Sequence, residues 1–177
     1  ERERTQLQAR MREEGVTHAI EPWDWRFWAE RVRQRIYAID DAEVKPYFPL
    51  ERMVAAAFDC AGRLFGVSFT ERADLPVYHP DVKAYEMRDR EGRVAGVFMH
   101  DHFARPSKRS GAWMSSFRIQ HIDREGTFVH PVITIVCNFT APTGDQPALL
   151  TYDEMLTFLH EFGHALHGLL SNVTFQS

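Results

Sequence analysis

Apolar residues recur at every third or fourth position through the first third of the chain, which is the spacing of amphipathic helices. The second of these stretches begins at Asp24, a residue suited to capping a helix, and its apolar pattern reaches Ile39. We expect a helical segment over residues 1–66, with helices at residues 1–14, 24–39 and 50–65.

Between residues 67 and 140 the pattern changes to short runs of β-branched and aromatic residues, which predict strands. Turn sequences such as Asp89-Arg90-Glu91-Gly92 separate the runs, so we expect the strands to pair antiparallel. The last run is apolar enough to be buried on both faces. The strands of this β-rich segment are expected at residues 67–69, 82–87, 94–103, 112–118 and 132–139.

Residues 141–177 are predicted to form a loop and then one more helix. Thr151, followed three residues later by Glu154, is the signature of a capping box and indicates where this helix begins. Its buried side is expected to consist of Leu156, Leu159, Phe162, Leu166, Leu169 and Leu170. Helices followed by a small, mostly antiparallel sheet and a further helix indicate the α+β fold class.

The last helix carries His160-Glu161-Phe162-Gly163-His164, a His-Glu-x-x-His arrangement. Because each residue turns a helix by about 100°, His160, Glu161 and His164 fall at about 0°, 100° and 40°, on one arc of one face. Two imidazoles one turn apart can bind a single zinc ion, and a catalytic zinc lowers the pKa of its bound water to about 7. Glu161 would accept the proton of that water as general base. The helix signals around the motif favour this interpretation over a chance match.

Three further histidines allow other interpretations. His167 falls on the same helix face, but about 10 Å of helix rise separates it from His160, so we interpret it as packed or supporting the site rather than as a ligand. His100 and His102 lie on one side of a predicted strand, which leaves a second metal site as an alternative. Since no third ligand lies nearby in the sequence, a surface or hydrogen-bonded role is favoured for them.

Residues 105–111, Arg-Pro-Ser-Lys-Arg-Ser-Gly, form the one concentrated basic loop. A solvated turn is the favoured interpretation. The alternative is recognition of a peptide's terminal carboxylate, because a guanidinium can pair with a carboxylate through two parallel hydrogen bonds. A sheet beside a zinc helix could also accept an extended peptide as an additional strand.

Composition narrows the function classes. The 21 basic and 25 acidic residues give a net charge of −4 without a long basic run, so no nucleic-acid partner is expected. No apolar run reaches the roughly 20 residues that span a membrane, and no signal peptide is visible. Cys60 and Cys137 are expected to be reduced, buried thiols, which suits a cytoplasmic protein. The chain begins at Glu1 rather than Met, which leaves its true start open.

Several stretches together resemble the M3 family of zinc peptidases, the group of thimet oligopeptidase and oligopeptidase A, and within it the bacterial peptidyl-dipeptidase Dcp branch most. The resemblance covers nearly the whole chain from about residue 20, in the family's order. The stretches that carry it are Pro22-Trp23-Asp24-Trp25, Tyr47-Phe48-Pro49-Leu50-Glu51, Arg63-Leu64-Phe65-Gly66, residues 104–113, Asn138-Phe139-Thr140 and His160 to Gly168.

The resemblance implies a zincin-like catalytic region in a mostly helical enzyme that cuts short peptides. His160 and His164 carry over as zinc ligands and Glu161 as catalytic base. The family's third ligand, a Glu on a following helix, has no counterpart here, because no Glu occurs after Glu161. We therefore expect an internal fragment whose three segments, 1–66, 67–140 and 141–177, are parts of one incomplete catalytic domain. It would bind zinc weakly and be inactive without the remainder of the parent chain.

The expected activity of the parent enzyme is hydrolysis of oligopeptides with release of C-terminal dipeptides. Two alternatives stay open. An oligopeptidase of the same family that cleaves internally would use the same chemistry, and a non-catalytic peptide-binding or assembly module would use the sheet and its groove alone.

Overall fold

The computed structural model describes residues 1–37, 41–144 and 146–174. Ile39, assigned to the second helix by its pattern, lies outside the described residues, as do the last three residues of the predicted segment 141–177. The chain forms two compact units, Glu1–Val44 and Lys45–Ser177. Each unit is described by itself; the division into segments 1–66, 67–140 and 141–177 stays a prediction.

The first unit consists of helices α1 (Arg2–Glu13), α2 (Trp25–Tyr37) and the short α3 (Asp41–Val44). The predicted helix at residues 1–14 is confirmed by α1, and its apolar residues Leu7 and Met11 are fully buried. They pack with Ile20 and Trp28 in a small core that joins α1 to α2. The amide of Gln8 fastens the connection between the two helices, since its Oε1 accepts a hydrogen bond of 2.7 Å from the Ile20 backbone N–H.

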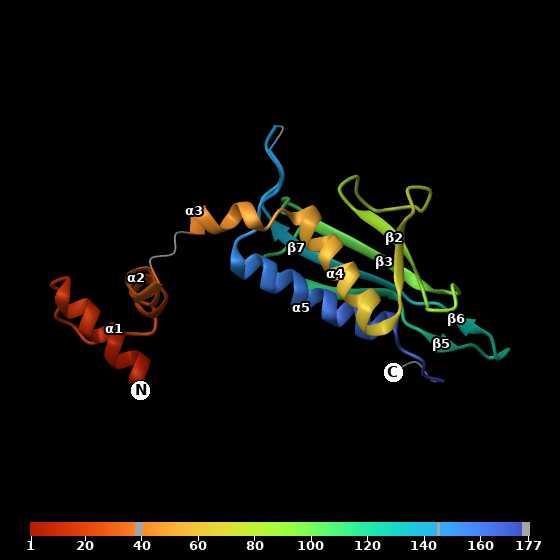
Figure 1. Cartoon of the computed structure of the whole chain (residues 1–177). Coiled ribbons are helices and arrows are strands. Elements are labelled where there is room, and N and C mark those ends of the chain that lie inside the picture. The colour runs from red at the N-terminus through yellow and green to blue at the C-terminus, as the bar shows by residue number, and fades with distance from the viewer. Residues whose placement is uncertain (38–40, 145, 175–177) are drawn as a thin grey trace. The chain divides into compact units, whose positions relative to one another are not determined.

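The second unit is built on a five-stranded sheet with two long helices on one face (Figure 1). The strand order is β1-β2-β3-β7-β4, and β5 and β6 form a separate two-stranded hairpin. The strands are β1 (Ser68–Glu71), β2 (Lys83–Arg88), β3 (Val94–Phe103), β4 (Trp113–Arg118), β5 (His121–Ile122), β6 (Phe128–Val129) and β7 (Val132–Phe139). The helices are the 3₁₀ turn η1 (Lys45–Tyr47), α4 (Leu50–Phe65) and α5 (Tyr152–Leu169).

The sheet is mixed and mostly antiparallel, which confirms the α+β class and the expected pairing apart from one parallel pair. β1–β2, β2–β3 and β4–β7 are antiparallel, whereas β3 and β7 are parallel. β7 lies between β3 and the edge strand β4. The chain reaches this position after β4 and the β5–β6 hairpin, and it then runs antiparallel to β4 and parallel to β3. As predicted, β7 is buried along most of its length.

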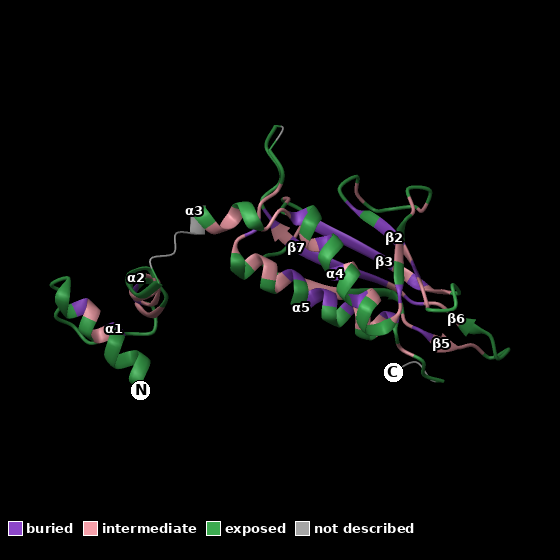
Figure 2. Cartoon of the chain, viewed as in Figure 1, coloured by how far each residue is buried: buried purple, intermediate pink, exposed green. Residues whose placement is uncertain are grey.

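The main core lies between the sheet and the two helices. α4 and α5 direct their buried sides, purple in Figure 2, toward the sheet. Phe158 and Phe162 of α5 are buried against Phe98 and His102 of β3, and each such aromatic side chain stabilises the fold by roughly 1.5–3 kcal/mol. This packing holds α5 against β3, β7 and β4.

The predicted start of α5 is confirmed, but its predicted buried side is partly wrong. The Thr151 hydroxyl accepts from the Glu154 N–H at 3.1 Å, and the Glu154 carboxylate accepts from the Thr151 N–H at 2.8 Å. This reciprocal pair is the expected capping box. Leu156, Leu159 and Leu170 are exposed, however, and the buried stripe consists of Phe158, Glu161, Phe162, Ala165 and Leu169.

Candidate active site

The exposed side of α5 brings His160 and His164 together. Their Nε2 atoms lie 3.1 Å apart, and the two ring planes are nearly perpendicular at 86°. Side chains four residues apart are neighbours on a helix surface, so this convergence follows from local geometry. Both imidazoles aim the same ring nitrogen at one point in space, which is the arrangement that two ligands of a single ion require.

The spacing of this histidine pair fits a metal such as zinc. Zinc–nitrogen bonds of about 2.0–2.1 Å at a tetrahedral angle place two nitrogens about 3.3 Å apart. The observed separation of 3.1 Å is close to that value. Within the part of the chain that the structure describes, no group of three or more His, Cys, Asp or Glu side chains is placed to hold a metal. Among the described residues, the histidine pair is therefore a set of two convergent nitrogens without a third donor.

Glu161 lies between the two histidines in sequence and next to them around the helix, where the exposed side turns into the buried side. It is 8% exposed and belongs to the buried stripe of α5, next to the sheet. Cys137 of β7 is near enough for electrostatic interaction: burial raises the pKa of its thiol to about 12, and the Glu161 carboxylate adds to that increase. The structure thus places Glu161 at the junction of α5 and β7, adjacent to the histidine pair.

The predictions for His167, His100 and His102 are confirmed only in part. His167 is exposed, so its interpretation as a packed residue is wrong. His100 and His102 share one side of β3, with ring centroids 4.1 Å apart, and both are buried. The predicted hydrogen-bonded role is confirmed for His100, whose Nε2 lies 3.3 Å from the Tyr85 hydroxyl, whereas both ring nitrogens of His102 lack a hydrogen-bond partner among the described residues. Burial lowers the pKa of His102 to about 3 and that of His100 well below its usual value.

A cavity of about 910 Å³ lies beside His100 and His102, away from the histidine pair of α5. Lys83, Glu51 and Arg52 contribute to its wall, and none of its lining residues belongs to α5. Size alone would favour this cavity, but the convergence of His160 and His164 is the more specific chemical feature. We therefore assign the candidate active site to the exposed side of α5.

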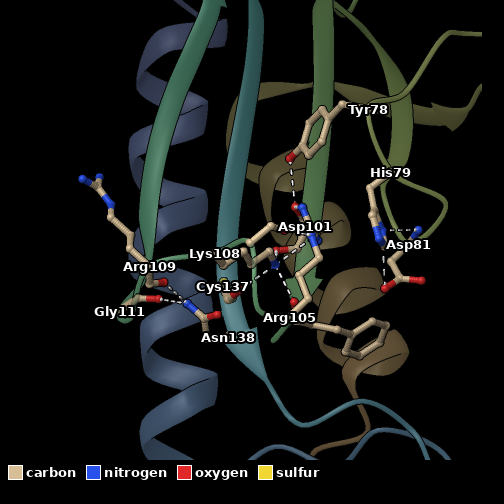
Figure 3. A network of polar contacts seen from close by, with 12 residues as sticks. Tyr78, His79, Asp81, Asp101, Arg105, Lys108, Arg109, Gly111, Cys137 and Asn138 are labelled. Atoms are coloured by element: carbon tan, nitrogen blue, oxygen red, sulfur yellow. Dashed lines mark hydrogen bonds and ion pairs between the residues drawn. The ribbon is translucent and has the colours of Figure 1, made fainter.

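The basic loop at residues 105–111 is exposed for the most part, as the favoured interpretation expects, but two of its cations are anchored inside the protein (Figure 3). Arg105 donates two hydrogen bonds of 2.7 and 2.6 Å to the carboxylate of the fully buried Asp101. Lys108 Nζ lies 2.8 Å from the same carboxylate and donates to the backbone oxygens of Phe103 and Cys137. Burial alone would raise the pKa of Asp101, but the hydrogen bonds from Arg105 and Lys108 outweigh it and the pKa is lowered.

Strand β4 is the edge strand of the sheet that α5 contacts. The order of the strands leaves β4 with β7 as its only neighbour in the described sheet, and α5 packs against both strands. The residues from Ser115 to Arg118 are exposed. An unpaired strand edge leaves backbone N–H and C=O groups open to an added strand, and β4 is such an edge in the described sheet.

Sequence reasoning missed two anchoring residues. Lys108 was treated as part of a solvated turn, although its side chain is only 3% exposed. Gln120 is fully buried and exchanges two hydrogen bonds with the backbone of Val173, which fixes the segment after α5. Lysine and glutamine are polar, so their residue types did not predict burial. Their burial depends on hydrogen-bond partners that come from other parts of the chain. Among the described helices, none is long and apolar enough to cross a membrane.

The sequence that carries the histidine pair, the edge strand and the basic loop is similar to known proteins. The sequence matches Peptidase family M3 along residues 1–177. The chain belongs to peptidase family M3. The resemblance expected from the sequence motifs is therefore confirmed.

Relatives within family M3 carry two kinds of name. Dipeptidyl carboxypeptidases of Salmonella typhimurium and Escherichia coli are 47% and 46% identical to this chain over 87% and 86% of its length, and the matches cover 22% of each relative. Oligopeptidase A of Salmonella typhimurium is 38% identical over 98% of the chain, which corresponds to 25% of that protein. The chain thus spans about a quarter of the length of these M3 relatives.

Proposed function

We propose that this chain carries part of the active site of a zinc metallopeptidase that hydrolyses oligopeptides. The observation that carries the proposal is the 3.1 Å separation of the His160 and His164 Nε2 atoms on the exposed side of α5. Membership of family M3 supports it, because the family is a peptidase family by description. In this proposal His160 and His164 are two ligands of one zinc ion, and the complete site takes its third ligand from outside the described residues.

Bound zinc would supply a Lewis acid and a water of lowered pKa. Glu161 accepts a proton from the attacking water and returns it to the leaving amine, a role that requires a carboxylate one residue from a ligand. The packing of Phe158 and Phe162 into the core holds the helix turn that carries these groups. A rigid turn keeps the relative positions of the two histidines and the carboxylate fixed, which lowers the entropic cost of reaching the reactive geometry.

The proposed substrate is an extended oligopeptide that pairs with the exposed edge of β4. The position of β4 next to α5 supports this, since a peptide added to that edge would pass beside the exposed side of the helix. Release of C-terminal dipeptides is proposed from the similarity to two dipeptidyl carboxypeptidases. Internal cleavage is the second candidate, supported by the similarity to oligopeptidase A over 98% of the chain.

The proposal is tested on the protein in its full natural length. We expect about one bound zinc per molecule in the wild type and loss of zinc in His160→Ala and His164→Ala, measured by elemental analysis after gel filtration. His167→Ala is the matched control, because it removes an exposed histidine of the same helix and should keep its zinc. Glu161→Gln should retain zinc and lower kcat by roughly 10²–10⁴-fold.

Mass spectrometry of the products separates the two cleavage modes. Sequential loss of C-terminal dipeptides from an N-terminally blocked peptide indicates the first mode, and cleavage of a peptide blocked at both ends indicates the second. Zinc bound equally well by His160→Ala and wild type would refute the proposed site. Peptide binding without zinc or turnover would instead indicate the non-catalytic module.

A further inference from the structure

The basic loop at residues 105–111 contains three cationic side chains, and two of them are already engaged inside the protein. Arg105 and Lys108 both contact the buried carboxylate of Asp101, and Lys108 also donates to backbone oxygens of β3 and β7 (Figure 3). Both cations are paired with Asp101, and the Lys108 side chain is only 3% exposed, so these two residues serve the internal framework of the protein.

Arg109 is arranged in the opposite way. Its backbone is held in place, because the Asn138 side-chain amide donates hydrogen bonds of 2.8 and 2.7 Å to the carbonyl oxygens of Arg109 and Gly111. Its side chain points outward past β4, whereas Arg105 and Lys108 point toward Asp101 (Figure 3). No carboxylate of the described residues forms an ion pair with the Arg109 guanidinium.

The Arg109 guanidinium is nevertheless positioned by an aromatic ring. It lies over the ring of Trp113, the first residue of β4, with 4.5 Å between the guanidinium carbon and the ring centroid. The negative face of the ring attracts the cation and restrains it without an ion pair. A fixed backbone and a restrained head group preorganise this cation for a planar, two-oxygen anion such as a carboxylate.

The location of Arg109 relates it to the histidine pair. Phe158, near the start of α5, contacts His102 at the end of β3, and Leu169 reaches Gly96 near the beginning of β3. The start of α5 therefore lies over the C-terminal ends of β3 and of the parallel β7. Because β4 is antiparallel to β7, its first residue lies at this same end of the sheet, paired with Val136. The histidines follow in the middle of the helix, where Phe162 contacts Phe98 in the middle of β3.

We propose that Arg109 binds the C-terminal carboxylate of a peptide lying antiparallel along β4. This inference rests on the proposed function and names the residue that selects the substrate's end. A peptide antiparallel to β4 directs its C-terminus toward the beginning of the strand, where Arg109 stands. Two extended peptide residues span about 7 Å. If the terminal carboxylate is held by a cation at a fixed position beyond the first residue of β4, the distance from this cation to the cleaved bond limits how many residues lie between them.

Binding to the full-length protein tests the proposal without requiring turnover. The probes are one dipeptide as the free acid and the same dipeptide as its C-terminal amide, titrated by calorimetry at low salt. In the wild type we expect the acid to bind more tightly than the amide. Arg109→Gln should weaken binding of the acid by roughly 10-fold to 100-fold and leave the amide unchanged. Arg109→Lys should fall between the two, since it keeps the charge but loses the planar pair of donors.

Arg118 provides the matched control, because it is an exposed arginine at the opposite end of the same strand, with its Nε donating to the His130 carbonyl oxygen. Arg118→Gln should preserve the preference for the acid. Loss of the preference in Arg118→Gln but not in Arg109→Gln would show that the peptide runs parallel to β4 and would overturn the proposal. Equal binding of acid and amide by the wild type, equal weakening of both by Arg109→Gln, or no binding of either would also overturn it.

Failure of the proposed function is distinguished by a separate measurement. If the wild-type preparation cleaves peptides but Arg109→Gln keeps its preference for the acid, only the assignment of Arg109 is wrong. If the wild type cleaves no peptide, the proposed function fails, while the comparison of acid and amide binding still decides whether Arg109 recognises a carboxylate.

Discussion

At the scale of single residues, burial decides which polar groups form the framework and which face a ligand. The buried Asp101 carboxylate is paired with both Arg105 and Lys108. Removing Asp101 would leave these cations without their partner, which is strongly destabilising for the buried Lys108. His160 and His164 instead stay on the surface, where two ring nitrogens converge without being buried. Residue type is the same for His102 and His160, but their surroundings differ.

The buried His102 leads to a prediction about pH. Burial, together with the positive charge of Lys108, lowers the pKa of His102 to about 3, so the imidazole is neutral in the folded state over most of the pH range. An unfolded histidine takes up a proton below a pKa of about 6.5. The unfolded state therefore binds more protons, and the stability associated with neutral His102 is fully present above pH 6.5 and is lost as the pH falls toward 3.

We expect His102→Phe to reduce this loss. The ring remains packed against Phe139 and Phe158, and two unpartnered nitrogens are removed. The stability of the variant relative to wild type should rise by about 1.4 kcal/mol per pH unit below pH 6.5. Denaturant unfolding of both proteins from pH 7.5 to 4.5 measures this difference, with His121→Phe as the control at a less buried histidine. Parallel pH profiles for wild type and His102→Phe would contradict the assignment.

At the scale of elements, local signals predicted the helices and strands well. The capping box at Thr151 and Glu154 was readable because it depends on residues three apart, and the strand runs were readable from their alternation and β-branched content. The buried side of α5 was only partly predicted: Leu156 and Leu159 are exposed, while Phe158 faces the sheet. Hydrophobic residues occur on more than one side of this helix, so the pattern alone could not select the side that packs.

The capping box leads to a prediction about helix stability. Thr151→Ala removes the side-chain acceptor of the Glu154 N–H and should lower the free energy of unfolding by about 1 kcal/mol. Thr151→Ser keeps the hydroxyl and should stay close to wild type. Chemical denaturation monitored by circular dichroism measures both variants, and hydrogen exchange should show the loss concentrated in the first turn of α5. Equal destabilisation by alanine and serine would indicate that packing of the threonine methyl, rather than the cap, is responsible.

At the scale of the whole molecule, the chain covers about a quarter of the length of its relatives in family M3. The described residues place two imidazoles together and no third metal-binding side chain with them. Two imidazoles satisfy only half of the four positions around a tetrahedral zinc ion.

We therefore expect the 177-residue chain by itself to bind zinc weakly and to show no peptidase activity. Competition with a chromogenic chelator should give a much lower zinc affinity for this chain than for the full-length protein, and a quenched oligopeptide should remain uncut. Turnover by the 177-residue chain that is abolished both by chelator and by Glu161→Gln would contradict this expectation.

The sequence by itself determined the helix that carries His160 and His164 and the capping box that begins it, because both depend on residues close together in the chain. It also determined the resemblance to family M3, because that rests on the identity and order of motifs along the chain and not on contacts between them. Only the tertiary structure decided that β7 runs parallel to β3, that β4 is the edge strand, and that Lys108 is buried while Arg109 points outward. Strand order and burial depend on contacts between distant segments, and neighbouring residues in the sequence carry no record of them.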